Sequence, residues 1–215
     1  MPRPLFTSGN NFPSPEFEVG GSKPIYYYIG KELPGGFNPD LSAFPKGSVV
    51  QTGTPIQVDE ATRQAKVHVA VKVYEAASSG DTSVKVAKLK GGSVLSVGQN
   101  VLVAPATIAG TGTGYAVTAI DSTNAAYDVL TLGAALGANL EEGAILVEAS
   151  ASGAGATIKV IPNALTRFDI YVDPTSTQFT CGAVAEATVY DRRIPPVAQV
   201  VKDLFQKEIT FSQSK

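Results

Sequence analysis

The 215-residue sequence has no tryptophan, one methionine, one cysteine and one histidine. A single cysteine, Cys181, excludes a disulfide within the chain and any zinc site built from several cysteines. No segment approaches the roughly 18 consecutive apolar residues of a membrane-spanning helix, and early prolines interrupt the apolar run that a secretion signal needs. We therefore expect a soluble protein, made in the cytoplasm, without a membrane partner.

Charge is also scarce and nearly balanced. Charged residues make up 17% of the chain, and 17 basic against 19 acidic side chains leave a net charge of −2. The basic residues are scattered, so the sequence lacks the clustered positive charge that binds a phosphate backbone. We expect no nucleic-acid partner.

The residues that are abundant favour a mainly β fold. Glycine (21 residues), proline (14) and many valines, threonines and alanines favour strands and turns over helices. The valines in KVHVAVKVY alternate with other residues, which predicts one continuous strand over 67–74 with one buried face. A short strand is expected over 25–29, and the Pro-Gly and Asn-Pro steps of 33–47 predict a loop.

Composition along the chain predicts three parts. Residues 1–24 are rich in Pro, Gly, Ser and Asn without a period, which is typical of an extended N-terminal arm. Residues 25–76 together with 151–215 are expected to form a host β-domain, either a small barrel or a sandwich. Residues 77–150 contain several short strands between turns, which predicts an inserted, small barrel-like β-domain.

The boundaries of the inserted domain and the C-terminus each have a recognisable sequence pattern. The small, polar stretches 75–81 and 148–156 are expected to be flexible linkers to the inserted domain. Two prolines at 195–196 can open one short helix within 196–207, and a terminal strand, ITFS, follows it. We expect the apolar face of the helix to pack on its own core, with docking on a partner as the alternative. That face consists of Val197, Val200, Val201, Leu204 and Phe205.

Two segments follow one plan, GSVVQTGTPIQV at 47–58 and GGSVLSVGQNVLV at 91–103. In each, a glycine, two apolar residues and a second glycine lead into alternating Ile or Val. Gly53 and Gly98 would supply positive φ at a tight turn between two strands. The simplest interpretation is two unrelated β-hairpins, and a duplicated barrel is the alternative.

Catalytic chemistry has little support. His68 lies among valines without a nearby carboxylate to orient it, so we interpret it as structural, and a lone Cys181 as a packing residue. A hydrolase would require these two side chains within hydrogen-bond reach. TGTG at 111–114 and GAGA at 153–156 lack the phosphate-loop signature and are expected to be loop tips. We expect no enzymatic activity and no cofactor.

Four acidic residues near predicted turns could in principle supply oxygen ligands to calcium. They lack the dense alternation of a calcium loop, so solvated carboxylates are the favoured interpretation and no metal site is predicted. These residues are Asp121, Asp128, Glu141 and Glu142.

Aromatic residues near the N-terminus are the candidate binding residues. Tyr26, Tyr27 and Tyr28 must point to both faces of a strand, so at least one ring is exposed. Exposed tyrosine favours a protein interface or a sugar surface, and burial under the arm is the alternative. The arm's irregularly spaced apolar residues are expected to be anchors that enter pockets of a neighbouring protein, with an unattached tail as the alternative. They are Leu5, Phe6, Phe12 and Phe17.

Two stretches resemble known virion proteins. FPKGSVVQTGTPIQVDEATRQAKVHVAVKVYEA resembles the β-rich segment of bacteriophage head decoration proteins, where a G-x-V/L-x-x-GT-P/V-L/I step followed by a residue such as Asp59 is common. YAVTAIDSTNAAYDVLTLGAALG, with the closing PPV…K…ITF segment, is similar to head fiber proteins of tailed phages. The likeness spans roughly 44–215, and its motifs are short and glycine-driven.

This resemblance implies a structural virion protein on the capsid exterior that binds the major capsid protein, commonly as a homotrimer, and is not an enzyme. The arm departs from the compact decoration pattern, which leaves capsid attachment and trimerisation both open for it. An alternative from another class is a carbohydrate-binding or adhesion module for a host-surface glycan. Its stacking platforms would be Tyr26 to Tyr28, or Tyr115 and Tyr127.

Overall fold

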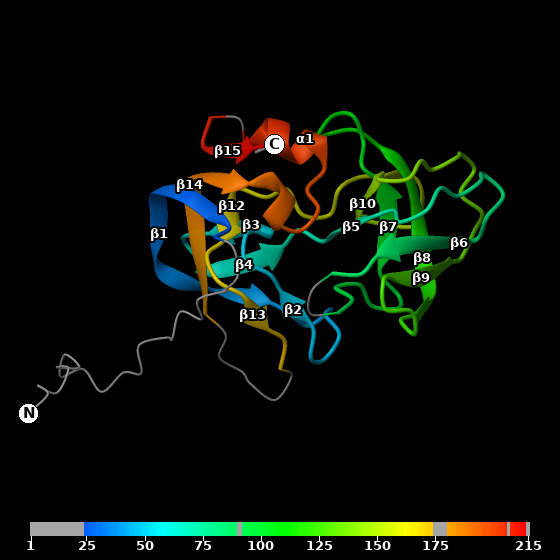
Figure 1. The fold of residues 1–215 in the computed structure, drawn as a ribbon, viewed down its shortest axis with the longest axis horizontal. Coiled ribbons are helices and arrows are strands. Elements are labelled where there is room, and N and C mark those ends of the chain that lie inside the picture. Colours follow the sequence, from blue (N-terminus) through cyan, green and yellow to red (C-terminus); the bar gives the residue numbers. More distant parts are fainter. Residues whose placement is uncertain (1–23, 90–91, 174–179, 206, 214–215) are drawn as a thin grey trace, which may run out of the picture.

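The computed structural model describes residues 24–89, 92–173, 180–205 and 207–213. Across these ranges the chain forms strands with one short α-helix and one short 3₁₀ helix (Asp191–Arg193), which confirms the mainly β prediction. Figure 1 shows two lobes, one with the labels β1, β12 and β14 and the other with β6 to β9. The arm anchors at residues 5, 6, 12 and 17 lie outside the described residues.

The first lobe is a curled six-stranded sheet in the order β1-β4-β3-β12-β14-β15. β1 pairs with β14 as well as with β4, so five of these strands close on themselves like a small barrel. A separate two-stranded sheet, β2 with β13, belongs to the same lobe (Figure 1). The strands are β1 (Tyr26–Asp40), β2 (Val49–Val50), β3 (Pro55–Asp59), β4 (Gln64–Val67), β12 (Ala164–Thr166), β13 (Ile170–Tyr171), β14 (Cys181–Tyr190) and β15 (Ile209–Ser212).

The second lobe is a seven-stranded sheet in the order β5-β10-β7-β8-β9-β6, with β11 paired to β8. Its strands come from one continuous stretch that starts at residue 70 and ends at residue 156, beyond the expected insert of 77–150 on both sides. That this stretch folds alone stays a prediction. The strands are β5 (Ala70–Lys72), β6 (Ser83–Ala87), β7 (Asn100–Val103), β8 (Gly112–Asp121), β9 (Tyr127–Leu132), β10 (Ile145–Glu148) and β11 (Gly153–Ala156).

β1 is much longer than the expected strand of 25–29. It continues through LPGGFNPD, so the loop prediction is wrong for residues 33–40. Gly35 and Gly36 have φ of +87° and +64°, a backbone region that other residues rarely adopt. They lie where the register shifts, before the strand changes partner from β14 to β4 at Asn38. The Pro-Gly and Asn-Pro steps do not end the strand, because pairing with β14 and then β4 continues past them and the irregular residues form a bulge.

The continuous strand expected over 67–74 is divided between the two lobes. β4 ends at Val67 and β5 begins at Ala70, and the residues between them connect the two sheets. The His68 N–H donates to the Pro55 carbonyl in the first lobe, and the Val69 carbonyl accepts from an N–H of the second lobe. His68 and Ala70, expected on the exposed face, are therefore buried, because the segment passes between two cores.

The expected linkers are hydrogen-bonded parts of the fold. Ala77 and Leu140 exchange a pair of backbone hydrogen bonds, and Glu148, 6% exposed, forms an ion pair with Lys159 at 2.7 Å. GAGA is strand β11, and it pairs with the TGTG end of β8, so neither motif is a loop tip. A side chain at Gly114 would come within 2.0 Å of a backbone carbonyl, so glycine permits this close approach.

The C-terminal helix and strand are confirmed. Helix α1 (Gln199–Leu204) is shorter than expected, and β15 pairs in parallel with β14. The helix face packs on its own core, except that Leu204 is 41% exposed. The helix ends at this residue, and Phe205, which follows it, fills the core position instead.

The two similar segments belong to a set of three. Gly47, Gly92 and Gly137 are equally spaced along the chain, and Gly53, Gly98 and Gly143 follow with the same spacing. All six have positive φ. After the second glycine of each unit a strand begins at an equivalent position, at Pro55, Asn100 and Ile145. The third copy, GANLEEGAILV, has the same glycine spacing, but sequence reasoning identified only the first two.

The three units also share their backbone hydrogen bonds. In each, the residue after the second glycine donates its N–H to the carbonyl three residues earlier, as in a turn with a glycine at its third position. These bonds are Thr54 to Gln51 (3.2 Å), Gln99 to Ser96 (3.2 Å) and Ala144 to Glu141 (3.1 Å). One residue from outside each turn also forms two backbone hydrogen bonds with it, by accepting from the second glycine and donating to the residue after that glycine. This residue is Thr166 in the first unit, Val117 in the second and Val73 in the third.

None of the units is a hairpin of its own flanking strands. β2 pairs with β13, whereas β3 pairs with β4 and β12. The hairpin interpretation is therefore wrong, and the pattern supports a repeated turn-and-strand unit used in both lobes.

A shared apolar cluster joins the lobes. Leu102 and Val147 of the second lobe belong to the same buried cluster as Leu165 and Val184 of the first. Helix α1 contributes Val201 to it and lies beside the junction in Figure 1. Burial of this surface favours contact between the lobes.

Candidate functional site

The tyrosine triplet divides into one internal anchor and two exposed rings. Tyr26 is half-buried, and its hydroxyl donates to the Thr166 carbonyl at 2.6 Å. The Arg167 guanidinium lies 5.7 Å from its ring centroid, and burial raises the pKa of Tyr26 above its ordinary range. Tyr26 is thus held by the first lobe.

Tyr27 and Tyr28 are 72% and 59% exposed. Strict alternation would send them to opposite faces, but the register shift between Tyr26 and Tyr28 is a bulge that leaves both outside. The edge of the Tyr27 ring meets Tyr190 at 6.1 Å, and Arg193 lies 4.1 Å above the Tyr190 ring. Tyr27, Tyr28, Tyr190 and Arg193 form what we call the β1 aromatic patch.

The patch lies where β1 has a free edge. In the described part of the chain, Tyr26–Leu33 pairs only with β14, and pairing with β4 starts at Asn38. Arg193 also donates to the Pro24 carbonyl at 2.8 Å, so Pro24, two residues before β1, is held at this patch. An aromatic surface beside an unpaired strand edge is suited to binding another protein.

The other predicted stacking platform is only partly present. Tyr115 is 7% exposed and its hydroxyl donates to the Leu136 carbonyl, so it cannot stack on a sugar, and that expectation is wrong. Tyr127 is half-buried, with its ring 5.1 Å from that of Tyr74 at an interplanar angle of 35°. Tyr74, which is 43% exposed, was missed, although its outward position in the valine alternation was a usable signal.

A groove opens beside Tyr74. It is lined by Lys72, Val73, Tyr74, Glu75, Ala87 and Glu142. The Lys85 Nζ lies 2.6 Å from the Glu75 Oε2 and 5.3 Å from the centroid of the Tyr127 ring. The hydrogen bond to Glu75 raises the pKa of Lys85, so this side chain is charged at neutral pH.

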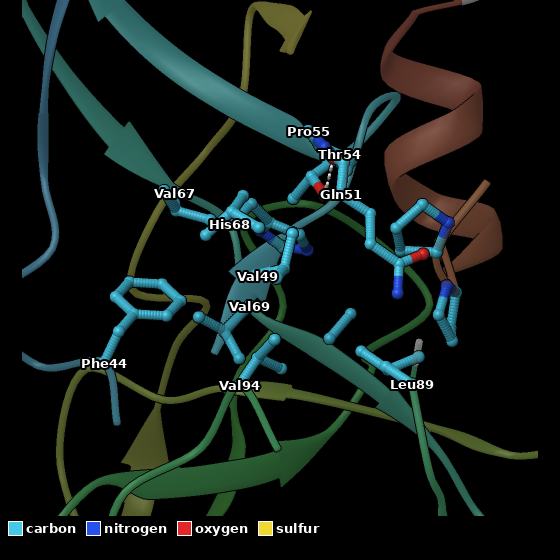
Figure 2. Close-up of a pocket in the computed structure, with 14 residues that line it drawn as sticks. Phe44, Val49, Gln51, Thr54, Pro55, Val67, His68, Val69, Leu89 and Val94 are labelled. Atoms are coloured by element: carbon cyan, nitrogen blue, oxygen red, sulfur yellow. Dashed lines mark hydrogen bonds between the residues drawn. The ribbon is translucent and has the colours of Figure 1, made fainter. Parts of the chain in front are cut away.

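His68 borders a small cavity at the junction of the lobes, as Figure 2 shows. Its Nδ1 lies 2.7 Å from the Val160 carbonyl, which can only accept, so Nδ1 carries the proton. Nε2 is buried and has no partner among the described residues. The cavity of about 20 Å³ has room for about one water. Burial lowers the pKa of His68, which favours the neutral imidazole.

Cys181 does not line this cavity. It is buried in β14 opposite Phe37, and burial raises the pKa of its thiol to about 11. The thiol is therefore protonated at neutral pH, and the hydrogen bond of His68 goes to Val160 instead. The geometry gives the hydrolase alternative no support.

The four acidic candidates do not converge. Within the described ranges, no group of three or more His, Cys, Asp or Glu side chains is arranged to hold a metal ion. Asp121 accepts from the Thr123 N–H at 2.9 Å, which lowers its pKa, and Glu141 and Glu142 are exposed at a turn. Asp128 was expected to be solvated but is 2% exposed. Its Oδ1 lies 3.2 Å from the Lys88 Nζ, which compensates the buried charge.

Among the helices that the structure describes, none is long and apolar enough to cross a membrane. No protein-family model, curated protein or solved structure matches the chain. The resemblance to phage head proteins therefore rests on short motifs alone.

Proposed function

We propose that the protein is a structural, non-enzymatic component of a virion, bound to the major capsid protein on the capsid exterior of a tailed bacteriophage. We further propose a homo-oligomer, with a trimer favoured. The observation that carries the proposal is the β1 aromatic patch. Tyrosine and arginine are among the residue types most enriched at interface hot spots, and the patch combines two exposed tyrosines with the half-buried Tyr190 and Arg193.

The patch is pre-organised for binding. The Tyr190 ring contacts both Tyr27 and Arg193, and Arg193 donates a hydrogen bond to the Pro24 carbonyl. Side chains that are already ordered lose less conformational entropy on association. A partner that covers Tyr27 and Tyr28 would gain their burial with little ordering of this surface.

The arm extends the same proposed interface. Its anchors, at residues 5, 6, 12 and 17, precede Pro24, which contacts the patch through Arg193. We propose that the arm and the patch together contact capsid or a neighbouring subunit, and that the second lobe faces away from the capsid.

The test compares the full chain with the double variant Tyr27→Ala/Tyr28→Ala. Co-sedimentation with capsids assembled from the major capsid protein of the same virus measures attachment, and sedimentation equilibrium measures the oligomer. We expect the double variant to bind at least about tenfold more weakly, because two hot-spot residues are removed, while its melting temperature is unchanged. Tyr171→Ala, at another exposed tyrosine, is the control and should bind as the wild type does.

Two results would overturn the proposal. The first is a full-length chain that neither binds these capsids nor self-associates. The second is a double variant that decorates capsids as well as the wild type does. A chain starting at Lys23 separates the contribution of the arm, since it removes the anchors and keeps the patch.

A further inference from the structure

We infer that the groove beside Tyr74 in the second lobe is a saccharide-binding site. This site is separate from the β1 aromatic patch and does not rest on the proposed capsid role. Its lining combines one exposed aromatic ring with both hydrogen-bond donors and acceptors.

The aromatic ring is held in place. Tyr74 packs on Tyr127, and Tyr127 is fixed in β9 opposite Ala87 of β6, which also lines the groove. A fixed ring presents an apolar face without further loss of rotamer freedom. A pyranose has such a face in its axial C–H groups, and aromatic stacking of this kind is typical of amphipathic ligands.

The polar groups suit hydroxyls rather than a charged ligand. Carboxylates only accept hydrogen bonds and ammonium groups only donate them, whereas each sugar hydroxyl does both. Lys72 and Glu142 in the lining have opposite charges, and Glu75 is neutralised by its ion pair with Lys85, which lies outside the lining. The groove therefore has no unbalanced charge to attract a phosphate or a strongly acidic or basic peptide. The chemistry therefore favours a neutral saccharide.

The two walls of the groove are locked together by the third repeat unit. The Val73 N–H donates to the Ala144 carbonyl at 2.8 Å, and the Val73 carbonyl accepts from the Gly143 N–H at 2.9 Å. These bonds fix the strand that carries Tyr74 and Glu75 against the turn that carries Glu142. A site built on paired backbone keeps its geometry before the ligand arrives.

The test uses the full chain on a printed panel of neutral hexose and N-acetylhexosamine oligosaccharides, with sialylated ones included. The strongest binder is then titrated by calorimetry against the wild type and variants. We expect saturable binding of a neutral saccharide, weakened about tenfold or more in Tyr74→Ala and by less in Glu142→Gln. Tyr74→Phe keeps the ring and should bind nearly as the wild type does.

Tyr171→Ala is the matched control, because it removes an exposed tyrosine of the first lobe, and it should leave saccharide binding unchanged. All variants must share the melting temperature of the wild type. The inference is overturned if no saccharide on the panel binds at millimolar concentration, if only charged saccharides bind, or if Tyr74→Ala binds as tightly as the wild type. Tyr27→Ala/Tyr28→Ala should retain saccharide binding, which keeps this result distinct from a failure of the capsid proposal.

Discussion

The repeated glycine turns allow backbone strain to be separated from steric contact. Gly98 has φ of +93°, and a Cβ added there would meet nothing within 4 Å. Gly98→Ala therefore tests strain alone, and we expect it to lower the free energy of unfolding by about 1–2 kcal/mol. At Gly53, with φ of +81°, an added Cβ would lie 2.5 Å from Ile194 Cγ2. Overpacking then adds about 1–3 kcal/mol to the same strain.

The assay is denaturant unfolding followed by far-ultraviolet circular dichroism, with Gly80→Ala as the control. Gly80 has no positive φ and open space around it, so alanine there should be neutral or stabilise by up to about 1 kcal/mol. The reasoning fails if Gly98→Ala is as harmless as Gly80→Ala, because the turn would then not require positive φ. It also fails if Gly53→Ala destabilises no more than Gly98→Ala, because contact with Ile194 would then be absent.

Three further predictions concern buried groups. The folded-state pKa of His68 lies below its ordinary 6.5, so the unfolded chain binds more protons below that pH; stability should fall as pH drops below 6.5, and melting curves of His68→Gln should lose this component. Val201→Ala, in the cluster shared by both lobes, should lower the unfolding free energy by about 2 kcal/mol in denaturant titrations, and Leu204→Ala by much less. Lys88→Met leaves the Asp128 carboxylate buried without its cation and should lower the unfolding free energy by about 3 kcal/mol, whereas a neutral result in thermal and denaturant melts would refute the pairing.

Local signals account for the parts of the fold that were predicted correctly. A mainly β chain, the helix after the proline pair, the ITFS strand and positive φ at Gly53 and Gly98 all depend on residues within a few positions. Each follows from side-chain period or backbone sterics. The third copy of the repeat, at 137–147, could also have been predicted from the sequence, because its two glycines have the same spacing as in the other copies.

The candidate sites depend on longer-range pairing. Tyr27 and Tyr28 are both exposed where β14 pairs with β1 across a bulge, and period-two alternation has no means of placing a bulge. Tyr115 and Tyr74 both lie in β-rich segments with similar neighbours, yet the first is buried and the second forms a groove wall. Which face of a strand is covered depends on sheets that are assembled from distant residues.

The sequence by itself determined the fold class, the turn glycines and the scarcity of reactive side chains, since composition and short-range sterics act within one segment of chain. Only the tertiary structure decided that residues 67–74 cross between two sheets, that TGTG and GAGA pair with each other, and that Glu142 and Tyr74 line one groove. Backbone groups must find hydrogen-bond partners and apolar faces must be covered, and many partners lie far along the chain. The β1 aromatic patch and the groove beside Tyr74 exist because those distant pairings leave particular side chains outside.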